Sequence, residues 1–109
     1  ICAGVAATYG GTITLDYHRN YPVMVNSEEQ TDFAAKVATS VSGGCDDAPL
    51  VMGGEDFAYM AIERPGAYIL CGNGDTANVH HPLYNFSDEA IPAGCSWWAG
   101  IVEQRMPAA

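Results

Sequence analysis

The sequence predicts an α/β fold, and three features of its 109 residues lead to that prediction. Apolar patterns with the period of helices and of strands alternate along its second part. Glycine and proline pairs separate these segments, as at Gly43-Gly44 and Pro65-Gly66. Hydrophobic residues make up 49% of the chain, which is enough to form a core in one small domain.

The first part of the chain is typical of a helix end followed by a strand. Residues 1–9 are rich in alanine, and Gly10-Gly11 follows as a helix stop. Apolar and polar residues then alternate over residues 12–18, which is the period of a half-buried strand. Tyr21-Pro22 ends this strand, because proline donates no hydrogen bond to a sheet.

A longer helix is predicted from Ser27 to Gly43-Gly44. Ser27 and Gln30 have the spacing of a capping box, in which each side chain satisfies the other residue's free backbone N–H. Apolar residues then recur every four positions from Phe33 to Val41, so one face of this helix is expected to be buried.

The remaining segments alternate between strand and helix. Two short apolar runs, residues 49–52 and 67–71, are bounded by turns and predict buried strands. A short helix is expected over residues 55–60, with acidic residues in its first turn. The last helix is expected to start between residues 87 and 92, with Trp97 against a neighbouring element. Its buried stripe would comprise Ile91, Cys95, Trp98 and Val102.

Charge and cysteine content exclude several classes of protein. Thirteen acidic residues face four basic ones, and a net charge of −9 repels phosphate backbones, so nucleic acid is not an expected partner. No apolar run reaches the ~20 residues that cross a bilayer, so no membrane is expected either. The four cysteines form no Cys-x-x-Cys pair, so a zinc ribbon or redox motif is not expected. Each lies among small or apolar neighbours, which favours buried free thiols in a reducing cytoplasm over a disulfide framework.

Two polar clusters are candidates for chemistry. His80-His81-Pro82 follows a glycine-rich loop after a predicted strand, where α/β proteins place their sites. Neutral imidazole is the commonest protein metal ligand, although a surface histidine pair without a role is the alternative. Glu55 and Asp56 could contact a metal or substrate in a polar cleft, or simply cap a helix. Cys95 and Ser96 have no histidine nearby in sequence, so they are poor candidates for a nucleophile.

Four stretches, in this order, together resemble one family. They are residues 17–26, the run Met52-Gly53-Gly54-Glu55-Asp56-Phe57, residues 65–74 and the run from Val79-His80-His81-Pro82 to Glu89. The family comprises the metal-dependent amidohydrolases that include hippurate hydrolase, aminoacylases and auxin-conjugate hydrolases, within the zinc metallopeptidase superfamily. Departures from its pattern are minor: Met24 where Thr is usual, Asn85 for Asp and Ser87 for Asn.

The resemblance implies a fold and a role for each site residue. Residues 1–24 resemble the end of an α+β lid, or dimerisation, domain. Residues 25–109 resemble the C-terminal part of a zinc-exopeptidase-like αβα catalytic domain. His80 aligns with the family's last metal ligand, whereas His81 stands where Asn is common and is given no such role. Glu55 and Asp56 match motif positions near the metal cleft, as substrate contacts or support for a ligand.

The resemblance also implies an activity that this chain does not hold alone. The family hydrolyses the amide bond of N-acyl amino acids with a two-metal site of zinc or manganese. Its general base and remaining ligands would lie upstream of Ile1, so no catalytic residue is expected here. We therefore expect the isolated chain to be an inactive fragment of a cytoplasmic homo-oligomeric enzyme.

Two alternatives remain open from the sequence. The chain could be a non-catalytic module for binding or self-association, in which residues 12–18 pair edge to edge with another chain. Alternatively, it could belong to a dipeptidase, carboxypeptidase or deacetylase of the same superfamily.

Overall fold

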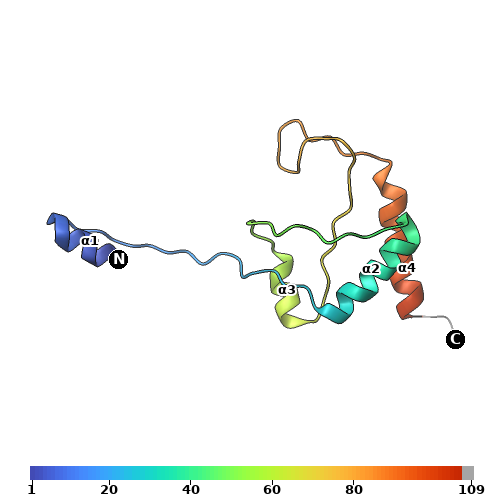
Figure 1. The fold of residues 1–109 in the computed structure, drawn as a ribbon, viewed down its shortest axis with the longest axis horizontal. Helices are drawn as coiled ribbons and strands as arrows, with labels where there is room; N and C mark the ends of the chain where they lie inside the picture. Colours follow the sequence, from blue (N-terminus) through green and yellow to red (C-terminus); the bar gives the residue numbers. More distant parts are fainter. Residues whose placement is uncertain (107–109) are drawn as a thin grey trace.

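A computed structural model describes residues 1–106, which form four helices and no strand (Figure 1). The helices are α1 (Cys2–Tyr9), α2 (Glu28–Ser42), α3 (Phe57–Glu63) and α4 (Ala90–Arg105). Residues 107–109, the end of the predicted catalytic segment, lie outside the described residues. No helix in the described part is long and apolar enough to cross a membrane.

Two helices end where their glycines predicted. Gly10 (φ 66°) follows α1 and Gly43 (φ 82°) follows α2, both in the left-handed region that glycine adopts without a steric cost. The Gly11 N–H donates to the Ala6 carbonyl at 3.0 Å, which satisfies a carbonyl that the helix end leaves free. The predicted ends of these two helices are therefore confirmed.

The start of α2 is where it was predicted, but the capping box is wrong. Ser27 is the N-cap residue, yet its side chain makes no capping hydrogen bond. Its backbone N–H donates instead to the Gly66 carbonyl at 2.9 Å. The Gln30 Oε1 accepts a hydrogen bond from Arg105 of α4 at 2.7 Å. Both members of the predicted box therefore have partners that are distant in sequence.

The three predicted strands do not form within residues 1–106. Residues 12–18, 49–52 and 67–71 have no ladder partner, and a strand exists only where a neighbour accepts and donates its backbone hydrogen bonds. Most of their apolar side chains are consequently exposed, and Leu50 and Met52 are fully so. The α/β alternation expected from the sequence is absent here, and what remains is a set of helices joined by extended segments.

The main packing contact is the crossing of α2 over α4 (Figure 1). Val37 of α2 is completely buried and Ala34 nearly so. Gly100 lets the helices approach closely, because a Cβ there would lie 2.9 Å from Val37 Cγ1. The Trp97 indole N–H donates to the Ala34 carbonyl at 3.1 Å. Trp97 thus packs on a neighbouring element, as predicted.

The other apolar stripe of α4 is exposed, which corrects the prediction. Trp98 is 64% exposed, and Ile91 and Val102 are about half exposed. None of the four cysteines is buried, although all are free thiols. Because α4 meets α2 through Gly100 and Trp97, the predicted stripe would need a sheet on its other side. The cytoplasmic location inferred from the thiols stays a prediction.

The segment before α2 extends away from the helices. The radius of gyration is 20.5 Å, against about 13 Å for a compact domain of 100 residues. Figure 1 shows α1 at the end of a long extended arm. The arm meets the body at α3, where the Tyr21 and Tyr59 rings lie 6.0 Å apart and the Tyr59 hydroxyl donates to the Asn20 carbonyl. A boundary near residue 24 stays a prediction.

Candidate functional site

His80 sits in a strained turn on a long loop. The His81 N–H donates to the Asn78 carbonyl at 3.1 Å and closes the turn. His80 is the third residue of this turn and has φ 68°, the one positive φ outside glycine within residues 1–106. A type II turn requires this backbone and favours glycine there, and another residue costs roughly 1–2 kcal/mol. Strain of this kind clusters at functional sites.

The two adjacent imidazoles differ in their surroundings. The His81 Nδ1 accepts a hydrogen bond from the Leu83 N–H at 3.1 Å. The His81 carbonyl accepts from the Tyr84 N–H at 2.9 Å, so Pro82 occupies a second turn. The His80 ring is exposed and makes no hydrogen bond within the described part of the chain. Both ring nitrogens of His80 are thus available to a ligand within the described part of the chain, whereas His81 has only its Nε2 without a hydrogen bond there.

Asn73 closes the base of the loop that carries His80. Its amide donates to the Asn85 carbonyl at 2.8 Å and accepts from the Ser87 N–H at 2.7 Å. Thr76 adds contacts of 3.3–3.4 Å to the backbone of Asn85. Residues 73–87 are therefore held as one loop from both ends. Sequence reasoning missed this role, and the only available signal was an amide residue between Gly72 and Gly74.

Glu55 lies at the start of α3 and is held as a carboxylate. Its Oε1 accepts a hydrogen bond from the Phe57 N–H at 3.0 Å. This contact, together with the Tyr68 hydroxyl, lowers the pKa of Glu55 below its ordinary value of 4.5. Hydrogen bonding to Glu55 likewise raises the pKa of Tyr68. Glu55 therefore supports the helix start, whereas the Asp56 side chain makes no capping bond and α3 begins at Phe57.

Asn26 fixes the segment that brings Tyr68 to Glu55. Its side-chain amide donates to the Tyr68 carbonyl at 3.0 Å and accepts from the Tyr68 N–H at 2.7 Å. This exchange of two hydrogen bonds replaces the strand partner that Tyr68 lacks. The Phe57 and Tyr68 rings, 5.6 Å apart, pack beside it. Neither Asn26 nor Tyr68 stood out as a site residue in the sequence.

The structure brings Glu55 to Tyr68 but does not join the acidic pair to His80. No hydrogen bond or ion pair links His80 with Glu55 or Asp56 among residues 1–106. The same residues contain no cluster of three His, Cys, Asp or Glu side chains suited to a metal. A catalytic zinc takes about three protein ligands. The imidazole of His80 fits one of those positions, and the described residues alone do not fit the whole set.

Comparison with known proteins defines the class of protein. The family model for peptidase family M20/M25/M40 matches residues 3–104, which is nearly the whole chain, and the chain belongs to that family. The resemblance found in its ordered motifs is thereby confirmed. The matched residues contain the run from Met52 to Phe57 and the run that begins at Val79.

Three curated relatives show how far the similarity extends. An N-acetyldiaminopimelate deacetylase of Exiguobacterium sibiricum is 36% identical over 95 residues, covering 84% of this chain and 25% of the relative. A hippurate hydrolase of Campylobacter jejuni is 30% identical over 105 residues (93% and 27%). An IAA-amino acid hydrolase of Arabidopsis thaliana is 33% identical over 91 residues (78% and 21%). The chain spans about a quarter of the length of these relatives. No solved structure gives a significant match.

Proposed function

We propose that this chain supplies one metal ligand and its supporting loop to a hydrolase that cleaves the amide bond of N-acyl amino acids. The observation that carries the proposal is the strained, clamped turn that presents His80. The names of the relatives support the reaction, since they describe deacetylation of N-acetyldiaminopimelate and hydrolysis of hippurate and of an amino acid conjugate. Because the acyl groups in these names differ, the proposed substrate is the class of N-acyl amino acids.

The proposed division of labour follows the two parts of the chain. We assign residues 1–24 to the end of a lid domain and residues 25–109 to a catalytic domain. The start of this catalytic part is held to its own later residues, because Asn26 and Ser27 form hydrogen bonds with residues 66–68. Residues 12–18 are all exposed and have no ladder partner, so they offer a strand edge to a second copy in a homo-oligomer.

His80 would hold a divalent metal, zinc or manganese, through a neutral imidazole nitrogen. The bound metal would polarise the amide carbonyl of the substrate as a Lewis acid. The protein's own contribution is geometric: His80 is exposed in the turn of residues 78–81, and Asn73 fixes the base of the loop. Glu55 stays ionised because its pKa is lowered, and it orients Tyr68. The other ligands and the general base would come from residues outside these 109.

The decisive experiment separates the two histidines. The chain should be produced together with whatever polypeptide its reading frame encodes before Ile1, and release of amino acid from N-acyl substrates should be measured with zinc or manganese. His80→Ala is expected to lower the rate at least about 100-fold. Loss of a metal ligand should cost more than loss of a residue that hydrogen-bonds to a ligand, which typically costs about 10–100-fold. The matched variant His81→Ala should keep most of the rate. Equal losses in both variants would contradict the ligand assignment.

A non-catalytic module for self-association is the second candidate, favoured by the uncovered residues 12–18 and the exposed face of α4. The 109-residue chain alone tests it. We expect no metal-dependent turnover from this chain, since about three ligands are needed. Light scattering after size exclusion would reveal a dimer, and a clean monomer at high concentration would argue against association through these surfaces.

A further inference from the structure

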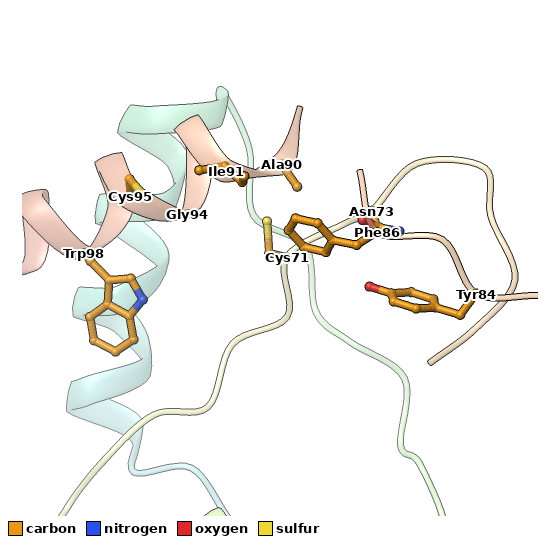
Figure 2. A pocket seen from close by; sticks show the side chains of 9 residues that line it. All are labelled: Cys71, Asn73, Tyr84, Phe86, Ala90, Ile91, Gly94, Cys95 and Trp98. Atoms are coloured by element: carbon orange, nitrogen blue, oxygen red, sulfur yellow. The ribbon is translucent and has the colours of Figure 1, made fainter. Parts of the chain in front are cut away.

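Asn73 and Asn26 hold the chain in the same way. Each side-chain amide donates from Nδ2 to one backbone carbonyl and accepts on Oδ1 from one backbone N–H, at distances of 2.7–3.0 Å. Figure 2 shows Asn73 next to Phe86, at the end of the His80 loop that meets α4. The two amides have equivalent hydrogen bonds, so a difference in their reactivity has to come from the residue that follows each of them.

The residues that follow the two asparagines differ in identity and in hydrogen bonding. Asn73 precedes Gly74, in the one Asn-Gly pair of the sequence, whereas Asn26 precedes Ser27. The Ser27 N–H donates to the Gly66 carbonyl at 2.9 Å. The Gly74 N–H has no backbone acceptor within residues 1–106. Gly74 is also exposed, and a Cβ built there would meet nothing within 4 Å. The backbone nitrogen beside the Asn73 amide is therefore free to react.

A free backbone nitrogen after asparagine can attack the asparagine side chain. The Gly74 nitrogen loses its proton and forms a bond to Asn73 Cγ, while the Cγ–Nδ2 bond breaks and ammonia leaves. The product is a cyclic succinimide. Water then adds to one of its carbonyl carbons and opens the ring, which yields aspartate or isoaspartate. The reaction consumes only water, and glycine favours it because no Cβ obstructs the nitrogen.

We propose that Asn73 is a site of spontaneous deamidation, and that its conversion releases the base of the loop that carries His80. Both products lack the Nδ2 donor to the Asn85 carbonyl. In isoaspartate the main chain passes through Cγ, so the oxygen that accepts from the Ser87 N–H becomes part of the backbone. The modification goes beyond the proposed hydrolase function, because it uses neither a metal nor a substrate.

Ser27→Gly provides a matched pair of sites within one protein. The variant has an Asn-Gly sequence at both positions and keeps the backbone N–H that donates to Gly66. The Ser27 side chain makes no capping bond, and glycine is tolerated at an N-cap, so the fold should be retained. The variant is incubated in mildly alkaline heavy-oxygen water, with and without guanidinium chloride. Peptide mass spectrometry then follows the uptake of solvent oxygen at each asparagine.

The expected rates separate the structural effect from the sequence effect. In guanidinium chloride Asn26 and Asn73 of the variant should react at similar rates. In the folded variant Asn26 has one more hydrogen bond to break, so it should react about 2- to 10-fold more slowly than Asn73. In the unchanged chain Asn73 should convert before any other asparagine. Equal rates in the folded variant, or complete protection of Asn73 in the folded chain, would overturn the proposed site.

The aged protein tests the release of the loop. Conversion adds a negative charge, so the isoaspartate product can be separated from the parent chain by ion exchange. Hydrogen exchange at the Asn85 and Ser87 amides should be about 2- to 10-fold faster in this product, because the loop base has lost hydrogen bonds. The Tyr68 amide, which Asn26 binds, should exchange at an unchanged rate. Unchanged exchange at Asn85 and Ser87 would overturn the proposed release.

Discussion

Replacing Gly100 with alanine tests whether the crossing of α2 and α4 holds the helices together. An alanine Cβ at this position would lie 2.9 Å from Val37 Cγ1, and Val37 is completely buried. Gly94 lies in the same helix, and a Cβ there would meet nothing within 4 Å. The two glycines therefore differ in packing but share the same helical backbone.

The expected magnitudes follow from two opposing effects. Alanine in a helix interior is more favourable than glycine by about 1 kcal/mol, so Gly94→Ala should stabilise the chain by about that amount. Gly100→Ala gains the same amount but adds an overpacking cost of about 1–3 kcal/mol. The free energies of unfolding of the two variants should thus differ by about 1–3 kcal/mol.

Urea unfolding followed by far-ultraviolet circular dichroism measures this difference. Combining Gly100→Ala with Val37→Ala should remove the extra cost, because the colliding methyl is gone, and the two changes should therefore be non-additive. If Gly100→Ala stabilised the chain as much as Gly94→Ala does, α4 would not pack on α2 at Gly100.

Three further outcomes are expected. Trp97→Phe should lower the free energy of unfolding by about 0.5–1.5 kcal/mol in the same urea assay, because the hydrogen bond to Ala34 is lost, and Trp98→Phe should change it little. The lowered pKa of Glu55 means that its contribution to stability is present above pH 4.5 and is lost as the pH falls through the pKa of the folded state. Glu55→Gln should therefore reduce the fall in the free energy of unfolding between pH 7 and pH 2. An unchanged fall would contradict this. His80→Gly should raise the melting temperature, since glycine relieves about 1–2 kcal/mol of strain at φ 68°, and a lower value would mean that the imidazole itself stabilises the turn.

Local signals predicted the helices well because a helix satisfies its own backbone. The glycines after α1 and α2 and the N-cap position of Ser27 could all be located from neighbouring residues. The strands depend on partners elsewhere. The alternation over residues 12–18 indicates which side chains could share a face, but it provides no neighbour to pair with.

The candidate site shows the same division between local and distant information. The His80 motif was visible in the sequence, whereas the positive φ that strains it was not. The partner of Glu55 could not be inferred, since Tyr68 reaches it only because Asn26 binds the Tyr68 backbone across 42 positions. Similarly, the capping box failed because Gly66, a residue distant in sequence, took the Ser27 N–H.

The hydrogen bonds between residues 26–27 and 66–68 hold together two segments that would lie on separate peptides if the chain were cut between them. The chain leaves this point through α2, returns through α3, and is joined there by hydrogen bonds of 2.7–3.0 Å. Residues 43–50, midway along the excursion, are all exposed and hence suited to proteolytic cleavage.

A single cut in residues 43–50 should therefore leave two peptides that remain associated. Two further hydrogen bonds would join the peptides across the cut. Trp97 donates to the Ala34 carbonyl, and Arg105 donates to the Gln30 side chain. The nicked chain is expected to elute as one species on size exclusion and to separate only in urea; separation in native buffer would show that these contacts are too weak. Residues 43–50 are thus a suitable place to divide the chain for fragment complementation, in which two separate pieces associate into one molecule. The packing of α2 on α4 would hold the two pieces together.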